Sequence, residues 1–528
     1  MLNKSHRDDR GVHGAQPAAP SSRIASLART PVGLVACGLA ALLLATSNGY
    51  GYHRDELYFR VLGQHPAWGY VDQPPLTPLL GRLATAVFGD HLWALRLPAT
   101  ACTVATAVLL ALIARELGGG RVAQTLAALG AGSAELIFGH LLLTNPVDDV
   151  VWSAVLLCAI RALTRAHPRW WLAAGVATGL GMYNKYLVVL LLLSLAAGLA
   201  LAGPRRVFAS RWVWAGVGVA FVLGAPNLVY QATHDWPQLA MSAAMARNEG
   251  AGFRAAFVPA QFLLLGPLLL PFEIAGLVVI WRDRLVRAVA VAYPVMCVTV
   301  LATAGQPYYT YGLLLTLYAA GCVAAGRWLA PAPARRAGLR RALVAATLAV
   351  HSTAAAIIAL PLVPQRSLAT APSINPLVPY QIGWPTYVRQ VADVYQALPP
   401  DDRARAVVIT DNYGQAGAIA RYGDRYGLPA VYSGHNELWH LARPPESATV
   451  VIMVGCFAGP GVFDPCPAHL GDHWWHELNV FDRFAGCEIA TTLDNGTGVG
   501  NEEGTPVRVC RNPRAPWSQL WPDFRHID

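Results

Sequence analysis

The chain has 528 residues, of which 54% are hydrophobic and only 13% are charged, and its formal net charge is +9. Soluble domains usually carry about 25% charged residues, so the composition excludes a large soluble protein and predicts a polytopic membrane protein. The net positive charge does not indicate a nucleic-acid partner, because the Lys and Arg residues lie in short segments between apolar stretches.

Apolar segments of the length needed to cross a bilayer, about 20 residues in a helix, define a predicted transmembrane domain over residues 31–362. About eleven can be placed. They cover 31–47, 92–114, 122–143, 149–163, 171–183, 186–203, 213–231, 258–281, 288–304, 308–328 and 341–362. The stretch 171–203, around Asn184 and Lys185, is ambiguous and can be divided differently. Residues 1–30 are polar and rich in Ala and Pro, typical of a disordered tail. They are too long and too charged for a simple signal peptide, so the first span is expected to remain as an anchor.

The loops between these spans predict the orientation of the chain. With the N-terminus in the cytoplasm, every loop on that side is short and Arg-rich, as the positive-inside rule requires. These loops run over 115–121, 161–169, 205–211, 282–287 and 335–341. We therefore expect a multi-pass protein of the plasma (inner) membrane, with everything from residue 363 onward outside the cytoplasm.

Residues 363–528 are predicted to form an extracytoplasmic α/β domain. The runs Ala406–Thr410 and Thr449–Val454 have the β-branched character of strands. Between them, Tyr413–Tyr426 is typical of a helix, closed by Gly427.

Cysteines in this C-terminal region are even in number, which outside the cytoplasm predicts two disulfides. They are Cys456, Cys466, Cys487 and Cys510. Three connectivities are possible, and we favour the neighbouring pairs Cys456–Cys466 and Cys487–Cys510. A zinc site is disfavoured because the sequence has no CxxC pair.

Polar residues directly after the first span form the most informative cluster. His53, Arg54, Asp55 and Glu56 are delivered to the membrane surface beside several tyrosines. A carboxylate here could take a proton from an acceptor hydroxyl, and the Arg could bind a phosphate. The alternative is a solvated interfacial loop with an aromatic belt.

Three further polar sets lie at predicted outer ends of spans, where ionisable groups are costly and often functional. Asp148 and Asp149 open the fourth span, although one of them could serve only as a helix cap. Lys185 could bind a phosphate as a point charge or simply extend to the interface. The segment Gln306–Tyr309 could bind substrate or form an aromatic belt.

A rigid, extended turn is predicted over Tyr70–Pro75, because its two prolines stop a helix from running through it. This turn would fix the outer loop above the first cluster. The chain contains no Walker motif and no GxGxxG, GxSxG or HExxH pattern, so ATP hydrolysis and nicotinamide chemistry have no support.

A set of short motifs runs through the chain. They are His53–Phe59, Trp68–Pro75, Arg96–Pro98, Thr144–Asp148, Asn184–Tyr186 and Pro307–Tyr309, with Asn412–Gly417, Tyr422–Pro429 and Tyr432–Asn436 in the C-terminal region. Taken together, these motifs resemble bacterial glycosyltransferase family 39, whose members are related to dolichyl-phosphate-mannose–protein mannosyltransferases and to the aminoarabinose transferase that modifies lipid A. The likeness extends over most of the chain, and the set is specific although each motif alone is weak.

This resemblance implies a GT-C fold, a sugar donor linked to polyprenyl phosphate, an extracytoplasmic acceptor and inversion at the anomeric carbon. By position, Asp55 matches the catalytic acid of the family's first outer loop, with Glu56 as the rival base. Asp148 matches the acid of the second outer loop, and Lys185 matches a basic residue that meets the donor phosphate.

Other residues in the matching outer segments are candidates for binding substrate. They are Tyr58, Asp72, Gln73, Gln306, Tyr308 and Tyr309. Many relatives carry Lys before Pro-Tyr-Tyr, where this chain has Gln306, so Arg54 or His53 is expected to compensate at the donor phosphate. Some relatives use a divalent cation such as Mg or Mn and others do not, and no pattern in this sequence decides between them.

Two other functions use the same residues. A transporter or a flippase for lipid-linked sugars could use the same charged side chains within the membrane as a path for its substrate. Transporters, however, tend to show broken helices in two related halves, and no such halving is evident in the sequence. A scaffold or sensor whose outer domain binds glycans would need neither Asp55 nor Asp148.

Overall fold

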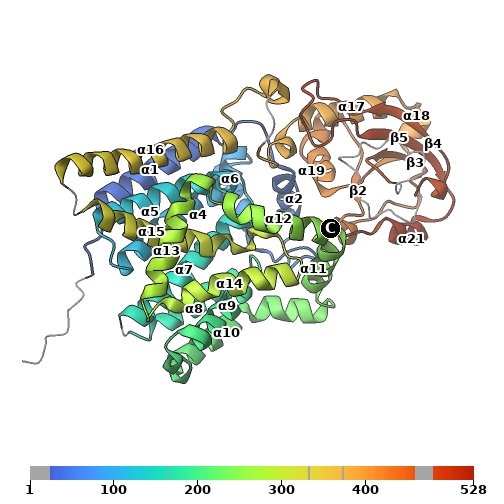
Figure 1. Ribbon diagram of the computed structural model, residues 1–528. Helices are drawn as coiled ribbons and strands as arrows, with labels where there is room; N and C mark the ends of the chain where they lie inside the picture. Colours follow the sequence, from blue (N-terminus) through green and yellow to red (C-terminus); the bar gives the residue numbers. More distant parts are fainter. Residues whose placement is uncertain (1–23, 166, 331–332, 371–373, 458–479, 528) are drawn as a thin grey trace, which may run out of the picture.

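The computed structural model describes residues 24–527, except 166, 331–332, 371–373 and 458–479. A helical bundle forms one end of the molecule and an α/β domain forms the other (Figure 1). Helix α2 (Arg54–Gln64) lies between them, beside α19 (Tyr413–Tyr422) of the α/β domain. The first polar cluster of the sequence therefore sits at the junction of the two parts.

Most predicted apolar spans coincide with helices of the bundle. These are α1 (Arg29–Thr46), α4 (Leu92–Glu116), α5 (Arg121–Ala134), α7 (Asn145–Thr164), α8 (Trp170–Gly181), α9 (Leu187–Ala202), α10 (Arg211–Thr233), α14 (Arg287–Ala302), α15 (Tyr311–Leu329) and α16 (Ala334–Ala359). The ambiguous stretch 171–203 is divided into two helices, α8 and α9. Helices α1 and α16, from opposite ends of the bundle sequence, lie side by side (Figure 1) and contribute Leu39, Leu43 and Ala359 to one apolar cluster.

Two predicted spans differ from the structure. The segment 258–281 is not one helix, because α12 (Gly250–Leu263) and the segment Pro267–Arg282, which contains α13 (Leu270–Arg282), are bent by 57°. Gly266 adopts a left-handed conformation (φ 91°) and Pro267 follows it, which together break the helix. The segment 122–143 is helical only to Ala134, followed by the short α6 (Leu136–Gly139).

By length and composition, five helices in the described chain can cross a membrane, or six if the bent pair is one span. They begin at Arg29, Leu92, Arg211, Pro307 and Arg335. Three shorter apolar helices, Leu76–Phe88, Leu187–Ala202 and Arg287–Ala302, accompany them. The total of eleven spans includes several short helices and stays a prediction.

In the described part of the bundle, three helices lie outside the predicted spans: α2, α3 (Leu76–Phe88) and α11 (Pro237–Asn248). Helix α2 begins in the polar cluster that could also be interpreted as an interfacial loop. Helix α3 is apolar but has only 13 residues, too few for a span. It begins directly after Pro75, in agreement with the expectation that the prolines interrupt helical structure there.

Small residues let the helices of the bundle approach closely. On α13, a Cβ added to Gly276 would lie 1.8 Å from the carbonyl oxygen of Leu317 on α15. On α15, one added to Gly321 would lie 1.9 Å from the carbonyl oxygen of Phe272. Backbone contact through such residues is typical of helix packing in membranes, where the solvent is as apolar as the side chains.

The α/β domain contains a five-stranded sheet with the order β2-β1-β3-β5-β4. Its strands are β1 (Ala406–Thr410), β2 (Val431–Ser433), β3 (Val450–Val454), β4 (Phe484–Thr492) and β5 (Pro506–Pro513). The first three are parallel, whereas β5 runs antiparallel to β3 and β4. The two strands and the helix that the sequence predicted are present, and Gly427 has the left-handed conformation of a helix end (φ 65°).

Each face of this sheet has its own apolar core. On one face, Val408 and Ile452 pack with α17 (Trp384–Ala397), α19 and the Leu57 and Phe59 side chains of α2. This core is therefore continuous with the bundle. On the other face, Ile409 and Met453 pack with aromatic residues near the C-terminus. The remaining short helices are α18 (Pro400–Arg403), α20 (Leu438–Leu441) and α21 (Trp517–Leu520).

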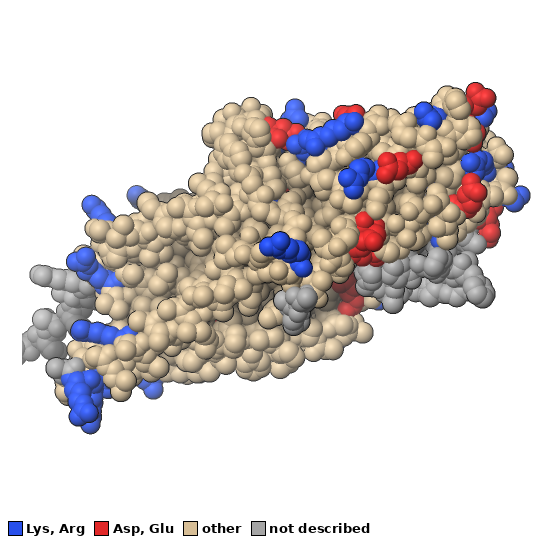
Figure 2. All heavy atoms as spheres, turned by 90° about the horizontal axis from the view of Figure 1, so that it is seen from above, with Lys and Arg blue, Asp and Glu red and all other residues tan. Residues whose placement is uncertain are grey.

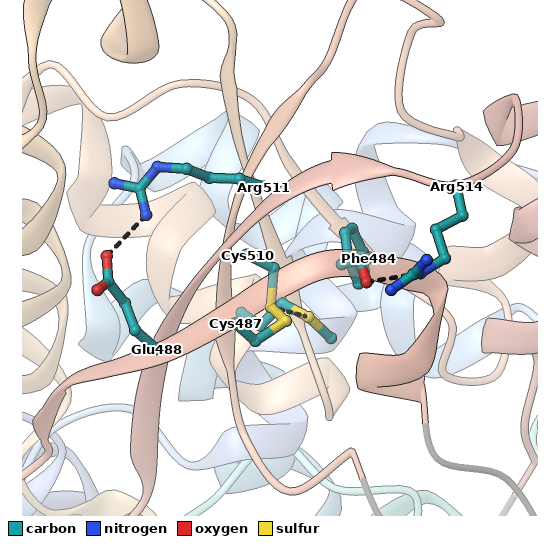
Figure 3. The surroundings of a disulfide bond; sticks show 7 residues. Phe484, Cys487, Glu488, Cys510, Arg511 and Arg514 are labelled. Carbon is teal, nitrogen blue, oxygen red and sulfur yellow. Dashed lines mark hydrogen bonds and ion pairs between the residues drawn. A yellow bond between two sulfur atoms is a disulfide. The ribbon is translucent and has the colours of Figure 1, made fainter.

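A disulfide joins Cys487 of β4 to Cys510 of β5, which are direct partners in the strand register (Figure 3). This is one of the two pairs favoured by the sequence. Beside it, Arg511 Nη1 donates to Glu488 Oε1 at 2.6 Å. Cys466 lies outside the described residues, so the pairing of Cys456 with Cys466 stays a prediction.

Charged side chains are unevenly distributed over the surface. Figure 2 shows Lys and Arg side chains gathered at the end of the molecule remote from the α/β domain, which itself carries both signs of charge. Between them lies a broad belt with few charged side chains on this face. Such a belt suits a protein surrounded by hydrocarbon.

Candidate active site

The first turn of α2 orients the polar cluster. His53 is its N-cap: the ring Nδ1 accepts a hydrogen bond from the Asp55 amide at 3.2 Å, and Glu56 Oε2 accepts from the His53 amide at 2.8 Å. This reciprocal arrangement is a capping box, which satisfies amides that the helix itself cannot pair. It directs the two adjacent carboxylates to different surroundings, since the Asp55 side chain is 29% exposed and that of Glu56 is fully buried.

Glu56 is paired with Arg96 of α4 in a buried ion pair. Arg96 Nε and Nη2 donate to the two Glu56 oxygens, both at 2.8 Å, and the Leu142 amide donates to Oε1 at 2.9 Å. Arg96 also donates to the carbonyls of Ser47 and Gly51. Both side chains are fully buried. With the His53 amide, four donors already occupy the Glu56 carboxylate, which suits a structural role better than that of a base.

Asp55 faces the α/β domain. The Tyr413 hydroxyl of α19 donates to Asp55 Oδ1 at 2.9 Å, and Arg54 Nε lies 3.7 Å from the same oxygen. Asp55 Oδ2 lies 3.8 Å from His53 Nδ1. The carboxylate is thus held on one oxygen while the side chain stays partly accessible.

Arg54 and His53 have different surroundings. The Arg54 guanidinium lies 4.3 Å from the ring centre of Tyr380 and 5.1 Å from that of Tyr413, within cation–π range. His53 is 1% exposed, and burial lowers the pKa of its ring. Because the His53 ring is enclosed and its Nδ1 already accepts from the Asp55 amide, Arg54 is the better candidate of the two for a phosphate.

The second and third polar sets meet through Asn184. Asn184 Nδ2 donates to Asp148 Oδ1 at 2.7 Å, and Thr77 of α3 donates to Asn184 Oδ1 at 2.6 Å. The next residue, Lys185, donates from Nζ to the Tyr308 hydroxyl at 3.1 Å. Asn184, whose neutral amide orients Asp148, is therefore the residue directly before Lys185.

Tyr308 connects this group with the first cluster, because the charges of both Asp55 and Asp148 act on its hydroxyl. Its ring stands perpendicular to that of Tyr309, with centres 5.1 Å apart. Gln306 directly precedes the short helix η3 (Pro307–Thr310), which carries both tyrosines. Asp149, by contrast, is 5% exposed, and its Oδ2 has no hydrogen-bond partner among the described residues.

Tyr58 and Asp72 belong to the junction with the α/β domain. The Tyr58 hydroxyl donates to Asp72 Oδ1 at 2.8 Å and accepts from the Glu437 amide at 3.2 Å. Glu437 Oε2 in turn accepts from the Val71 amide at 2.9 Å. The Pro-rich turn is thereby tied to both α2 and the α/β domain. Gln73 is 6% exposed at this turn.

Stability should depend on pH through Asp72. Burial raises the pKa of Asp72 to about 7, against the opposing effect of the Tyr58 hydrogen bond. A carboxyl group that holds its proton more tightly when folded makes the free energy of unfolding fall as pH rises from about 4 to about 7, and level off above. Asn does not titrate, so the melting temperature of Asp72→Asn should rise relative to that of wild type as pH increases over this range. A constant difference would contradict this prediction.

Arg96 and Tyr413 were not identified as site residues from the sequence. An arginine inside an apolar span was a usable signal for Arg96, since such a charge is nearly always paired. Tyr413 is separated from Asp55 by 358 positions and carried no signal of that contact. Within the described chain, no group of three or more His, Cys, Asp or Glu side chains could hold a metal ion.

Comparison with known proteins agrees with the motifs. Residues 72–230 match the family model described as dolichyl-phosphate-mannose-protein mannosyltransferase. A search of curated protein sequences finds no match.

Solved structures share the fold over nearly the whole chain. ArnT from Cupriavidus metallidurans bound to undecaprenyl phosphate has a TM-score of 0.54 at 14% identity, covering 91% of this chain and 98% of that one. Its apo form has a TM-score of 0.56 at 14% identity, with 92% and 98% covered. The arabinofuranosyltransferase AftD from Mycobacteria has a TM-score of 0.51 at 16% identity, covering 93% of this chain but only 40% of its own. The family match over residues 72–230 and the fold shared with ArnT and AftD agree with the resemblance carried by the motifs.

Proposed function

We propose that the protein is an inverting membrane glycosyltransferase that moves a sugar from a polyprenyl-phosphate donor to an acceptor hydroxyl on the extracytoplasmic side. The observation that carries the proposal is the position of Asp55. It is a partly exposed carboxylate at the end of the bundle where Lys185, Tyr308 and Asp148 also meet. The family match and the likeness to ArnT, whose structure was obtained with undecaprenyl phosphate, support this choice of donor.

In the proposed reaction the acceptor oxygen attacks the anomeric carbon from the face opposite the phosphate. The bond between the anomeric carbon and the phosphate oxygen breaks, and polyprenyl phosphate leaves with the electron pair. Asp55 takes the proton of the acceptor hydroxyl. Lys185 and Arg54 stabilise the charge that develops on the leaving phosphate, an effect that is strong where water is excluded. Asp148, fixed by Asn184, binds the acceptor or the sugar.

Lys185 should be needed for its charge. Replacing it with Met removes a charged contact to the donor phosphate, which is worth about 1.5–3 kcal/mol and hence roughly 10- to 100-fold in kcat/KM. Lys185→Arg keeps the charge and should retain most of the activity. The measurement is the initial rate of sugar transfer over a range of donor concentrations. Equal activity of Lys185→Met and wild type would favour the alternative that this side chain only reaches toward the interface.

The function itself is tested by transfer of radiolabelled sugar in membranes that carry wild type or Asp55→Asn. A small panel of polyprenyl-phosphate sugars serves as donors, and protein, polysaccharide and glycolipid fractions are examined for label. Transfer by wild type alone supports the proposal and identifies the donor. If neither protein consumes a donor while wild type moves labelled lipid between leaflets, the flippase alternative replaces it.

A further inference from the structure

We propose that Tyr413 of the α/β domain is a positioning residue for Asp55, so that the active site is completed by a domain distant in sequence. This inference rests on the proposed function, in which Asp55 is the base. The Tyr413 hydroxyl donates to Asp55 Oδ1 at 2.9 Å. Residues 363–528 would then be part of the catalytic unit rather than an appended module.

The Tyr413 ring is held on its α2 side by stacking. It lies on the Tyr58 ring with centres 4.7 Å apart and planes inclined by 26°. His435 contacts the ring at a centre distance of 4.6 Å, and the guanidinium of Arg54 lies over it. Aromatic pairs of this geometry contribute about 0.5–1.5 kcal/mol each beyond area burial. The direction of the hydroxyl is therefore determined before any substrate binds.

The backbone that carries Tyr413 is equally well fixed. Asn412 caps α19, accepting from the Gln415 amide at 3.0 Å, and the Gln415 side chain returns to the Asn412 amide. The Tyr413 amide itself donates to His435 Nδ1 at 3.3 Å. Helix α19 also touches α2 directly, since a Cβ added to Gly417 would lie 2.8 Å from the Leu57 backbone. The first turns of α2 and α19 thus form one rigid pair.

A phenol that donates to a carboxylate has two effects on a general base. It stabilises the ionised form, so that the base is available at lower pH. It also occupies Oδ1, which leaves Oδ2 to receive the proton of the acceptor. No change of charge on Tyr413 is required.

The test is the pH dependence of kcat/KM for Tyr413→Phe. Losing one hydrogen bond to a charged group changes an equilibrium constant by about tenfold. The acidic limb of the profile should therefore move to higher pH by about one unit. The variant should therefore be about tenfold slower on the acidic side and approach wild type at high pH. Tyr395→Phe is the matched control, because Tyr395 lies on α17 and its hydroxyl contacts only the Arg403 carbonyl among the partners identified for it.

The outcomes separate this inference from the function on which it rests. A Tyr413→Phe profile that superimposes on wild type, or that is lowered equally at every pH, overturns the positioning role while leaving the glycosyltransferase intact. Absence of transfer by wild type, or full activity of Asp55→Asn, removes the proposed function instead. Thermal melting of each variant verifies that the proteins compared are folded.

Discussion

Asp55→Asn should lower sugar transfer by at least about 10²- to 10⁴-fold, the usual contribution of a general base. The amide has nearly the same shape as the carboxylate, and its carbonyl oxygen can still accept the hydrogen bond from Tyr413. The variant should therefore fold and bind the donor like wild type. The loss should be found in kcat, measured as the rate at saturating donor.

The matched control is Asp424→Asn, which removes an exposed carboxylate in the first turn of the short helix η6 (Gly423–Tyr426) that follows α19. Its transfer rate should remain close to that of wild type. Near-normal turnover by Asp55→Asn would remove the assignment of the base and return attention to the rival base, Glu56.

Arg96→Ala and Glu56→Gln should destabilise the protein severely. Arg96→Ala leaves the fully buried Glu56 without its counter-charge. Glu56→Gln leaves the fully buried Arg96 without its counter-charge and with weaker hydrogen bonding. Breaking a buried pair from one side typically costs about 3–5 kcal/mol, a large part of the stability of most domains. We expect a strong fall in melting temperature and in the monodisperse fraction recovered in detergent.

Two comparisons make this second prediction sharp. Arg443→Ala breaks an ion pair with Glu446 in which the two side chains are 54% and 49% exposed, and should change the melting temperature little. The double variant Glu56→Leu/Arg96→Met should lose less than the sum of the single losses, because no orphaned charge remains. If Glu56→Gln were as stable as wild type but inactive, Glu56 rather than Asp55 would be the base.

The sequence predicted most helices of the bundle because its apolar segments have about the length that a helix needs to cross a bilayer. It missed α2 because polar residues begin that helix, and its apolar face is buried against the α/β domain rather than in lipid. The bend at Gly266 could not be inferred from hydropathy, since both halves are apolar.

The candidate site was predicted only as separate segments. Asp55 and Glu56 are adjacent and chemically similar, and only the fold shows that one is exposed while the other pairs with Arg96. The resemblance made His53 a candidate for the donor phosphate, whereas in the fold it is a buried N-cap of α2. Such differences depend on contacts across hundreds of residues, which periodicity and spacing do not encode.

The core shared by α2 and the α/β domain has a consequence for biogenesis. Leu57 and Phe59, near the start of the chain, pack in the same cluster as Val507 and Val509 of the last strand. Helix α2 therefore cannot reach its final surroundings until almost the entire polypeptide has been synthesised and its C-terminal part has folded. If the proposed function holds, a truncated chain that lacks β5 would enter the membrane without a completed site, and we expect it to be inactive.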